Sequence, residues 1–127
     1  MKLNPDCIRD ILLYVESSTD LQHAVSISPR EIPDELSKYS GNEVMYHIKQ
    51  TELSGLLLVP SWYMDGECMI RYLLPEGHKF LSDIREDTNW NKTKECAKKV
   101  GSNSLDALKQ IASTLITTLI QSQFGLS

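Results

Sequence analysis

The clearest hydrophobic pattern in the chain lies between two boundary signals, in residues 40–55. Ser40 and Glu43 stand three positions apart, the spacing of a capping box at a helix start. Gly55 supplies the left-handed conformation that commonly ends a helix. The stretch between them therefore predicts a helix. Its buried face is expected at helical spacing, at Val44, Ile48 and Thr51, with His47 beside them.

The N-terminal segment predicts an earlier helix. Asn4 is a favourable cap, Pro5 suits the first helical position, and Asp6 lies where the helix dipole favours an anion. We expect this helix to end near Ser18. Its buried stripe is predicted to be Ile8, Ile11, Leu12 and Val15.

Short apolar runs predict a small amount of β-structure. Residues 25–28 are expected to form a short strand, and residues 56–63 and 68–74 are expected to form a hairpin. The hairpin turn falls at Asp65-Gly66, because both positions tolerate positive φ. Pro60 inside the first of these runs suits an edge strand or a bulge.

The order of these elements predicts the fold class. Residues 33–37 should form a short helix, and together with the helix after Ser40 they make a helix-turn-helix. We expect an α+β winged helix-turn-helix, with a three-helix core, a β-hairpin wing and additional C-terminal helices. The prediction is a single domain over residues 1–127. Within it, residues 1–86 are the winged-helix core and residues 88–123 are a C-terminal helical extension.

Three helices are predicted after the wing. Pro75 should begin the first, with Leu81 and Ile84 on its inner side. Thr88 or Asn89 is expected to cap the second, which runs to Val100. Gly101 should end that helix, and Ser104 should begin the last one.

The last helix carries more apolar positions than a lone surface helix needs, and residues 111–121 have no charge. One reading places it inside the core, and the other makes it a subunit interface. A wide apolar stripe of this kind favours a homodimer. The predicted interface residues are Leu108, Ala112, Leu115 and Leu119, which follow a seven-residue rhythm with Leu105, flanked by Ile111, Ile116 and Ile120.

The net charge of the chain differs from that of a dedicated nucleic-acid binder, which usually has a basic face. The net charge is −4 over the whole chain, and residues 30–55, which hold the recognition region, carry a net −2. Residues 78–100 carry a net +2. An acidic recognition region disfavours phosphate binding. If DNA is bound, the residues expected to face it are Asn42, Tyr46, Lys49 and Gln50 from the helix, with Met45 beside them, and Arg71 from the wing.

No pattern in the chain predicts a metal site, a cofactor or catalysis. His47, His78, Cys68 and Cys96 are residue types that bind zinc, but none shows paired ligand spacing. Three cysteines at irregular spacing imply no disulfide framework. Catalytic motifs are absent, and the acidic group Asp83, Glu86 and Asp87 is accompanied by Lys79 and Arg85, as on many helix surfaces. We expect a cytoplasmic protein that is not an enzyme and has no membrane-spanning segment or signal peptide.

Two family resemblances are carried by particular stretches. Residues 47–56 resemble the recognition helix of ArsR-like and MarR-like winged helices, with Thr51 and Ser54 replacing a leucine and an alanine. Residues 4–15, 44–56, 77–85 and 90–94 resemble an uncharacterised bacterial and prophage family, the domain of unknown function numbered twenty-five thirteen. That resemblance implies a small winged-helix-like protein, often phage-associated, with no established activity. Leu74-Pro75-Glu76 departs from the family pattern, which has Leu-Thr there, so the start of the following helix is less well defined.

Two functions of different kinds remain at this stage. The leading prediction is a small DNA-associated transcriptional regulator of phage type, in which two copies supply the affinity that so few basic residues cannot, and the other function is the alternative to it. The second is an interaction module of phage or prophage origin that uses the same fold to bind a protein and does not bind DNA. The two differ in their response to salt, since DNA binding weakens steeply as the salt concentration rises.

Overall fold

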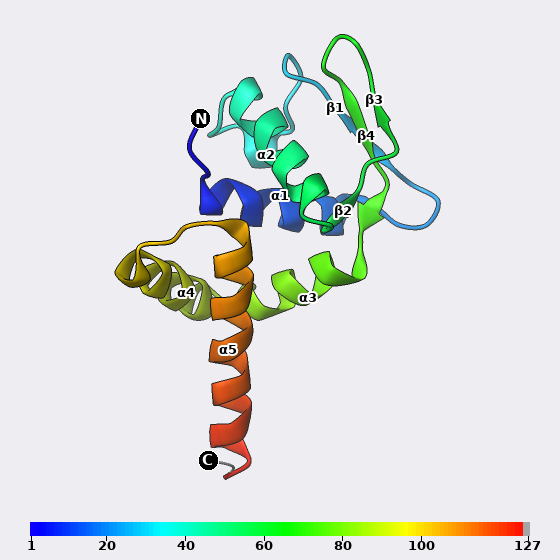
Figure 1. Ribbon diagram of the computed structural model, residues 1–127. Helices are drawn as coiled ribbons and strands as arrows, with labels where there is room; N and C mark the ends of the chain where they lie inside the picture. The colour runs from blue at the N-terminus through cyan, green and yellow to red at the C-terminus, as the bar shows by residue number, and fades with distance from the viewer. Residues whose placement is uncertain (126–127) are drawn as a thin grey trace. The chain divides into compact units, whose positions relative to one another are not determined.

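The structure is a computed structural model that describes residues 1–125, and the chain is α+β (Figure 1). Within the described residues it has five α-helices, one 3-10 helix and five short strands. None of these helices combines the length and the apolar character that a membrane crossing requires. In chain order the elements are α1 (Pro5–Ser18), β1 (Val25–Ile27), η1 (Asp34–Leu36), α2 (Gly41–Leu53), β2 (Leu57–Leu58), β3 (Ser61–Trp62), β4 (Cys68–Ile70), β5 (Tyr72–Leu73), α3 (Pro75–Ile84), α4 (Asp87–Val100) and α5 (Leu105–Gln123).

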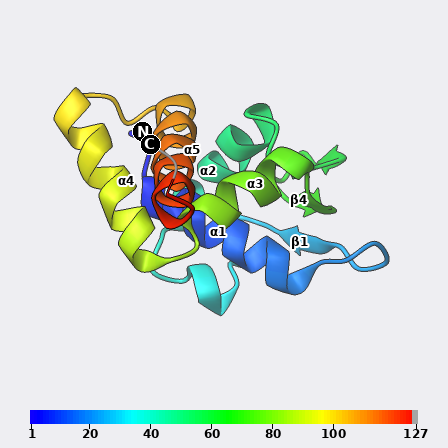
Figure 2. The same cartoon turned by 90° about the horizontal axis from the view of Figure 1, so that it is seen from below.

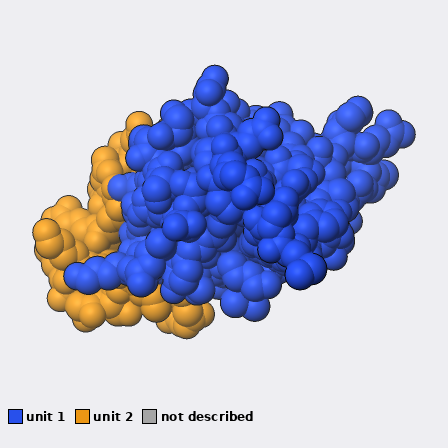
Figure 3. Space-filling view, turned by 90° about the horizontal axis from the view of Figure 1, so that it is seen from above, with its two compact units in different colours: residues 1–78 blue, residues 79–127 orange. Residues whose placement is uncertain are grey.

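The chain divides into two compact units, Met1–His78 and Lys79–Ser127 (Figure 3). The division falls inside α3. The second half of α3 is grouped with the helices that follow. Lys79 Nζ, for example, lies 3.5 Å from Ser113 Oγ of α5.

Side-chain caps hold the starts of α1 and α2, as the sequence predicted. The Asn4 side chain accepts hydrogen bonds from the backbone N–H groups of Asp6 and Cys7, and Ser40 Oγ accepts from the N–H of Glu43. The capping box at α2 is only half formed. The carboxylate of Glu43 accepts from Asn4 Nδ2 at 3.3 Å and is turned toward α1. The predicted buried stripe of α1 is confirmed, and Cys7 is buried beside it.

The strands form two small antiparallel sheets. The larger has the order β1-β4-β3, with Val25 opposite Ile70 and Ser61 opposite Met69. The smaller pairs β2 with β5. Each predicted hairpin strand is therefore broken into two short pieces. Pro60 lies at the first break, because proline has no N–H to donate to a ladder.

The hairpin turn lies where the sequence predicted it. The N–H of Gly66 donates to the carbonyl of Tyr63 at 3.0 Å, and Gly66 has φ +89°. The N–H of Tyr63 in turn donates to the carbonyl of Glu67 at 2.8 Å. A turn followed by a left-handed residue is one of the common ways to close a hairpin. The predicted short helix over residues 33–37 is a 3-10 helix, η1, whose Leu36 is fully buried.

The approach of α3 to the loop after α2 depends on a glycine. The N–H of Leu74 donates to the carbonyl oxygen of Leu56 at 2.9 Å. A Cβ atom added at Gly77 would lie only 2.2 Å from that same oxygen. The first turn of α3 can therefore approach Leu56 only because residue 77 has no side chain.

The second unit is built on α4 and α5, which pack side by side in both Figure 1 and Figure 2. Glu86 is the N-cap of α4 without a side-chain cap bond, so the predicted cap at Thr88 or Asn89 is wrong. Gly101 ends α4 with φ +76°, and Ser104 caps α5 through the N–H of Ala107, both as predicted. Trp90 is buried, and the Lys94 ammonium lies 5.4 Å from its ring centroid.

Candidate functional site

The outer face of α2 is the first candidate surface. Asn42, Tyr46 and Lys49 are exposed and Gln50 is half-buried, which agrees with the side of the helix that the sequence assigned to solvent. Met45 was expected on that side as well, but only 8% of it is exposed. The buried arc of α2 is therefore wider than predicted. It comprises Val44, Met45, His47, Ile48 and Thr51.

Lys49 is the only lysine or arginine on α2, and its ammonium contacts two side chains of the same chain. Its Nζ lies 3.0 Å from Glu52 Oε1 and 4.8 Å from the centre of the Trp62 ring. The indole Nε1–H of Trp62 donates to the same carboxylate oxygen at 3.0 Å. Glu52 and Trp62 thus hold the ammonium between a carboxylate and an aromatic face, and they join α2 to β3.

Arg71, the base expected on the wing, does not lie at its tip. It stands between β4 and β5, and its Nη2 donates to the carbonyl oxygen of Leu21 at 2.7 Å. At the tip itself Arg30 lies 3.6 Å from Asp65, which offsets a positive charge with a negative one. The structure therefore brings Asn42, Tyr46, Lys49 and Gln50 together on one helix and leaves Arg71 engaged elsewhere.

Sequence reasoning missed several apolar side chains around this helix face. Leu53, the last residue of α2, is 69% exposed, and Met64 at the hairpin tip is fully exposed. Tyr63 is also exposed and helps to line an open hollow of about 460 Å³ at the tip. The available signal was the position of Tyr63 and Met64 directly before the Asp65-Gly66 turn, because a hairpin tip faces solvent. We give the name α2–hairpin face to solvent-facing side chains of α2 and the hairpin, which the contact of Lys49 with Trp62 links; its residues are Asn42, Tyr46, Lys49, Leu53, Trp62, Tyr63 and Met64.

The unit that carries this face is strongly acidic. Residues 1–78 contain six lysines and arginines against twelve aspartates and glutamates, a net of −6, whereas residues 79–127 carry seven against five, a net of +2. The whole-chain value of −4 hides this asymmetry. The negative charge of the first unit would repel a phosphate backbone.

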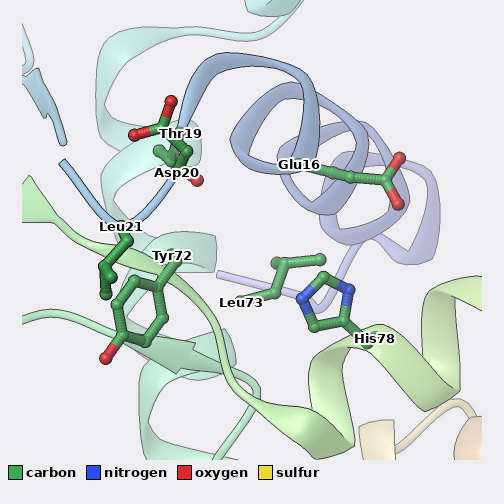
Figure 4. A pocket seen from close by; sticks show the side chains of 7 residues that line it. All are labelled: Glu16, Thr19, Asp20, Leu21, Tyr72, Leu73 and His78. Carbon is green, nitrogen blue, oxygen red and sulfur yellow. The ribbon is translucent and has the colours of Figure 1, made fainter. Parts of the chain in front are cut away.

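A second concave site lies beside the end of α1 (Figure 4). It has a volume of about 350 Å³ and is lined by Glu16, Thr19, Asp20, Leu21, Tyr72, Leu73 and His78. The Asp20 carboxylate is occupied by His23 Nδ1 at 2.8 Å, and that hydrogen bond lowers its pKa. In Figure 4 the Glu16 carboxylate points away from the Tyr72 ring. The lining offers no nucleophile held by a base, so its geometry indicates a surface hollow and no particular chemistry.

The histidines and cysteines considered as zinc ligands do not come together in the described residues. His47 is buried and hydrogen-bonded at both ring nitrogens, while His78 lies in the hollow beside α1. Across residues 1–125, no three His, Cys, Asp or Glu side chains are grouped closely enough to hold a metal ion.

The three cysteines are free thiols in different environments. Burial is the main cause that raises the pKa of Cys7 to about 12, helped by the charges of Glu43 and Asp10. Burial likewise raises the pKa of Cys68 to about 12, helped by Glu52 and Glu67. Cys96 is half-buried and lines a hollow against α5.

Alkylation should separate these thiols. Because the thiolate is the reactive form, we expect iodoacetamide at about pH 8 to modify Cys96 first and to leave Cys7 and Cys68 unmodified in the folded protein. Mass spectrometry of the digested protein would locate each adduct, and the same reaction in urea should modify all three. Labelling of Cys7 in the native protein as fast as Cys96 would contradict the buried placement.

The residues predicted for a dimer interface are divided by the structure. Leu108 and Ala112 are buried within the single chain, so they have no surface to offer to a second copy. The prediction is wrong for these two because α4 packs against the first half of α5. Leu115 is half-buried, and Leu119 is exposed.

Comparison with known proteins finds a matching family model and a relative of nearly the same length. A family model described as a hypothetical protein (DUF2513) matches residues 2–103. An uncharacterised protein of Haemophilus influenzae is 34% identical over 123 residues, which cover 94% of this chain and 99% of that protein. No solved structure matches the chain.

Proposed function

The chain belongs to the DUF2513 family, and we propose that it is a non-enzymatic protein-interaction module with a winged-helix fold. Its binding surface is the α2–hairpin face. The partner is a protein, and DNA is not required.

The element order supports the winged-helix assignment. Residues 1–78 run helix, strand, short helix, helix and hairpin, with α2 in the place of a recognition helix. The strand order β1-β4-β3 lays the first strand against the second strand of the hairpin, β4. Fold alone does not fix function, since one fold supports many unrelated sites. The surface chemistry therefore has to decide between the two functions.

The observation that carries the proposal is the state of Lys49. Its ammonium is paired with Glu52 and lies against the Trp62 ring, so the nearby carboxylate offsets the only basic charge on the helix. The large exposed apolar side chains of α2 and the hairpin tip are Tyr46 and Leu53 on the helix and Met64 at the tip. Tyrosine and methionine are enriched at protein interfaces, and exposed apolar groups of this kind mark binding surfaces.

The test compares capture of a partner by two variants of the full chain. We expect wild type to retain a protein partner from a lysate of the source cell, and Leu53→Ser with Met64→Ser to lose at least about tenfold of that binding. Leu21→Ser is the matched control, because Leu21 is just as exposed but lies outside the face. Quantitative mass spectrometry of the nuclease-treated eluates gives the measurement.

The regulator alternative has its own signature. A mobility shift on mixed duplexes at low salt, weakened by Lys49→Ala and lost steeply at higher salt, would support DNA binding and overturn the proposal. Equal partner recovery by the face variant and by Leu21→Ser would also overturn it, because binding would then not use this surface.

A further inference from the structure

The second half of α5 carries an apolar stripe whose later residues are left exposed by the described part of the chain. Leu119 is 42% exposed, Ile120 is 51% exposed and Phe124 is 76% exposed. Leu115 and Ile116 are half-buried on the same side. The first half of the helix behaves differently, since Leu105, Leu108 and Ala112 are buried. We call the set Leu115, Ile116, Leu119, Ile120 and Phe124 the α5 stripe.

The stripe occupies one side of a helix whose other side is polar. Leu115 and Leu119 are four apart, as are Ile116 and Ile120, so they form two neighbouring rows on the helix surface. Thr117, Thr118 and Gln121 are exposed on the remaining arc. An amphipathic helix of this kind buries its apolar side against something.

Charge narrows the choice of occupant. The chain has no charged residue after Lys109, so neither the stripe nor the polar arc behind it carries a charge. Helices that lie on membranes usually carry Lys and Arg on the polar side. Two uncharged helices, by contrast, can meet without repulsion, and a two-fold contact requires only that one surface complement itself. Apolar rows on identical helices meet that condition.

We propose that the α5 stripe binds the α5 stripe of a second copy of this chain. The proposal does not rest on the α2–hairpin face, since it uses different residues in the other compact unit. The stripe is small beside the roughly 1,000 Å² that a specific interface should bury in total, since two of its five side chains are already half-buried. Association should therefore be weak and dependent on concentration.

Sedimentation equilibrium of the full chain tests this contact. The weight-average mass should rise with concentration from that of one 14.4 kDa chain toward that of two. In Leu119→Lys with Ile120→Lys the rise should disappear, because charges would be placed face to face in a dry contact. Thr118→Lys with Gln121→Lys adds the same charge to the polar arc and should leave the rise intact. Circular dichroism checks that both variants keep their helices, and Leu119→Ser with Ile120→Ser replaces the first variant if it does not fold.

Three outcomes overturn the proposal. A wild-type chain that stays monomeric at every concentration has no self-association to explain. Equal loss of the rise in both lysine variants would make net charge, and not the stripe, responsible. A monomeric wild type that co-sediments with vesicles of phosphatidylcholine and phosphatidylglycerol would assign the stripe to a lipid surface.

Discussion

Replacing Gly77 with alanine should lower the free energy of unfolding by about 3 kcal/mol. The added Cβ would stand 2.2 Å from the carbonyl oxygen of Leu56 and 3.1 Å from its carbonyl carbon. Both atoms are backbone, so relief requires a shift of α3 or of the chain after α2. Alanine favours helix over glycine by about 1 kcal/mol, and the expected loss is what remains after that gain.

Glu76→Ala is the matched control for this substitution. Glu76 is the preceding residue of the same helix turn and is exposed, so its change should stay within about 0.5 kcal/mol of wild type. Urea unfolding followed by circular dichroism measures both variants. If Gly77→Ala were as stable as Glu76→Ala, the close approach of α3 to Leu56 would be refuted.

Much of the local structure could be predicted because its signals are local. Asn4 and Ser104 cap helices through N–H groups only two or three residues away, and Gly101 ends a helix by its own backbone conformation. Such interactions need no knowledge of the rest of the chain. The buried stripe of α1 follows from the helical period for the same reason.

Interactions between distant residues were the ones that could not be predicted. Glu43 has the spacing of a capping box, but its carboxylate binds Asn4, which is 39 residues away. Met45 looked solvent-facing because the apolar arc of α2 appeared narrow. That arc is wide because α2 packs on both α1 and β2. The pairing of β1 with β4 is of the same non-local kind.

The candidate site shows the same division. The exposed positions Asn42, Tyr46 and Lys49 follow from the period of α2, so their placement was predictable. The contact of Lys49 with Trp62 joins a helix to a strand, and no spacing along the sequence reveals it. That contact changes the chemistry of the face, since it places the one lysine of α2 against an aromatic ring and beside the Glu52 carboxylate.

His47 is the side chain that joins α2 to the start of α1. It is fully buried, and its Nε2 accepts the backbone N–H of Asn4 at 2.7 Å. Its Nδ1 lies 2.7 Å from the carbonyl oxygen of Glu43, and because a carbonyl can only accept, Nδ1 carries the proton. The two bonds therefore require one tautomer of the ring, with the proton on Nδ1 and the lone pair of Nε2 accepting the Asn4 N–H. Asn4 is also the cap of α1, so this bond connects the N-terminal end of α1 to the middle of α2.

The substitution His47→Leu should lower the free energy of unfolding by about 2–3 kcal/mol, because leucine leaves the Asn4 N–H without an acceptor. The substitution His47→Gln should lower the free energy of unfolding by only about 1 kcal/mol. The glutamine amide oxygen can occupy the position of Nε2 and accept the same N–H. The carbonyl oxygen of Glu43 loses only the side-chain hydrogen bond in either variant. It still accepts the backbone N–H of residue 47, as carbonyls inside a helix do. Urea unfolding of both variants beside wild type gives the two differences. Equal losses for leucine and glutamine would mean that packing, and not the bond to Asn4, is what His47 contributes.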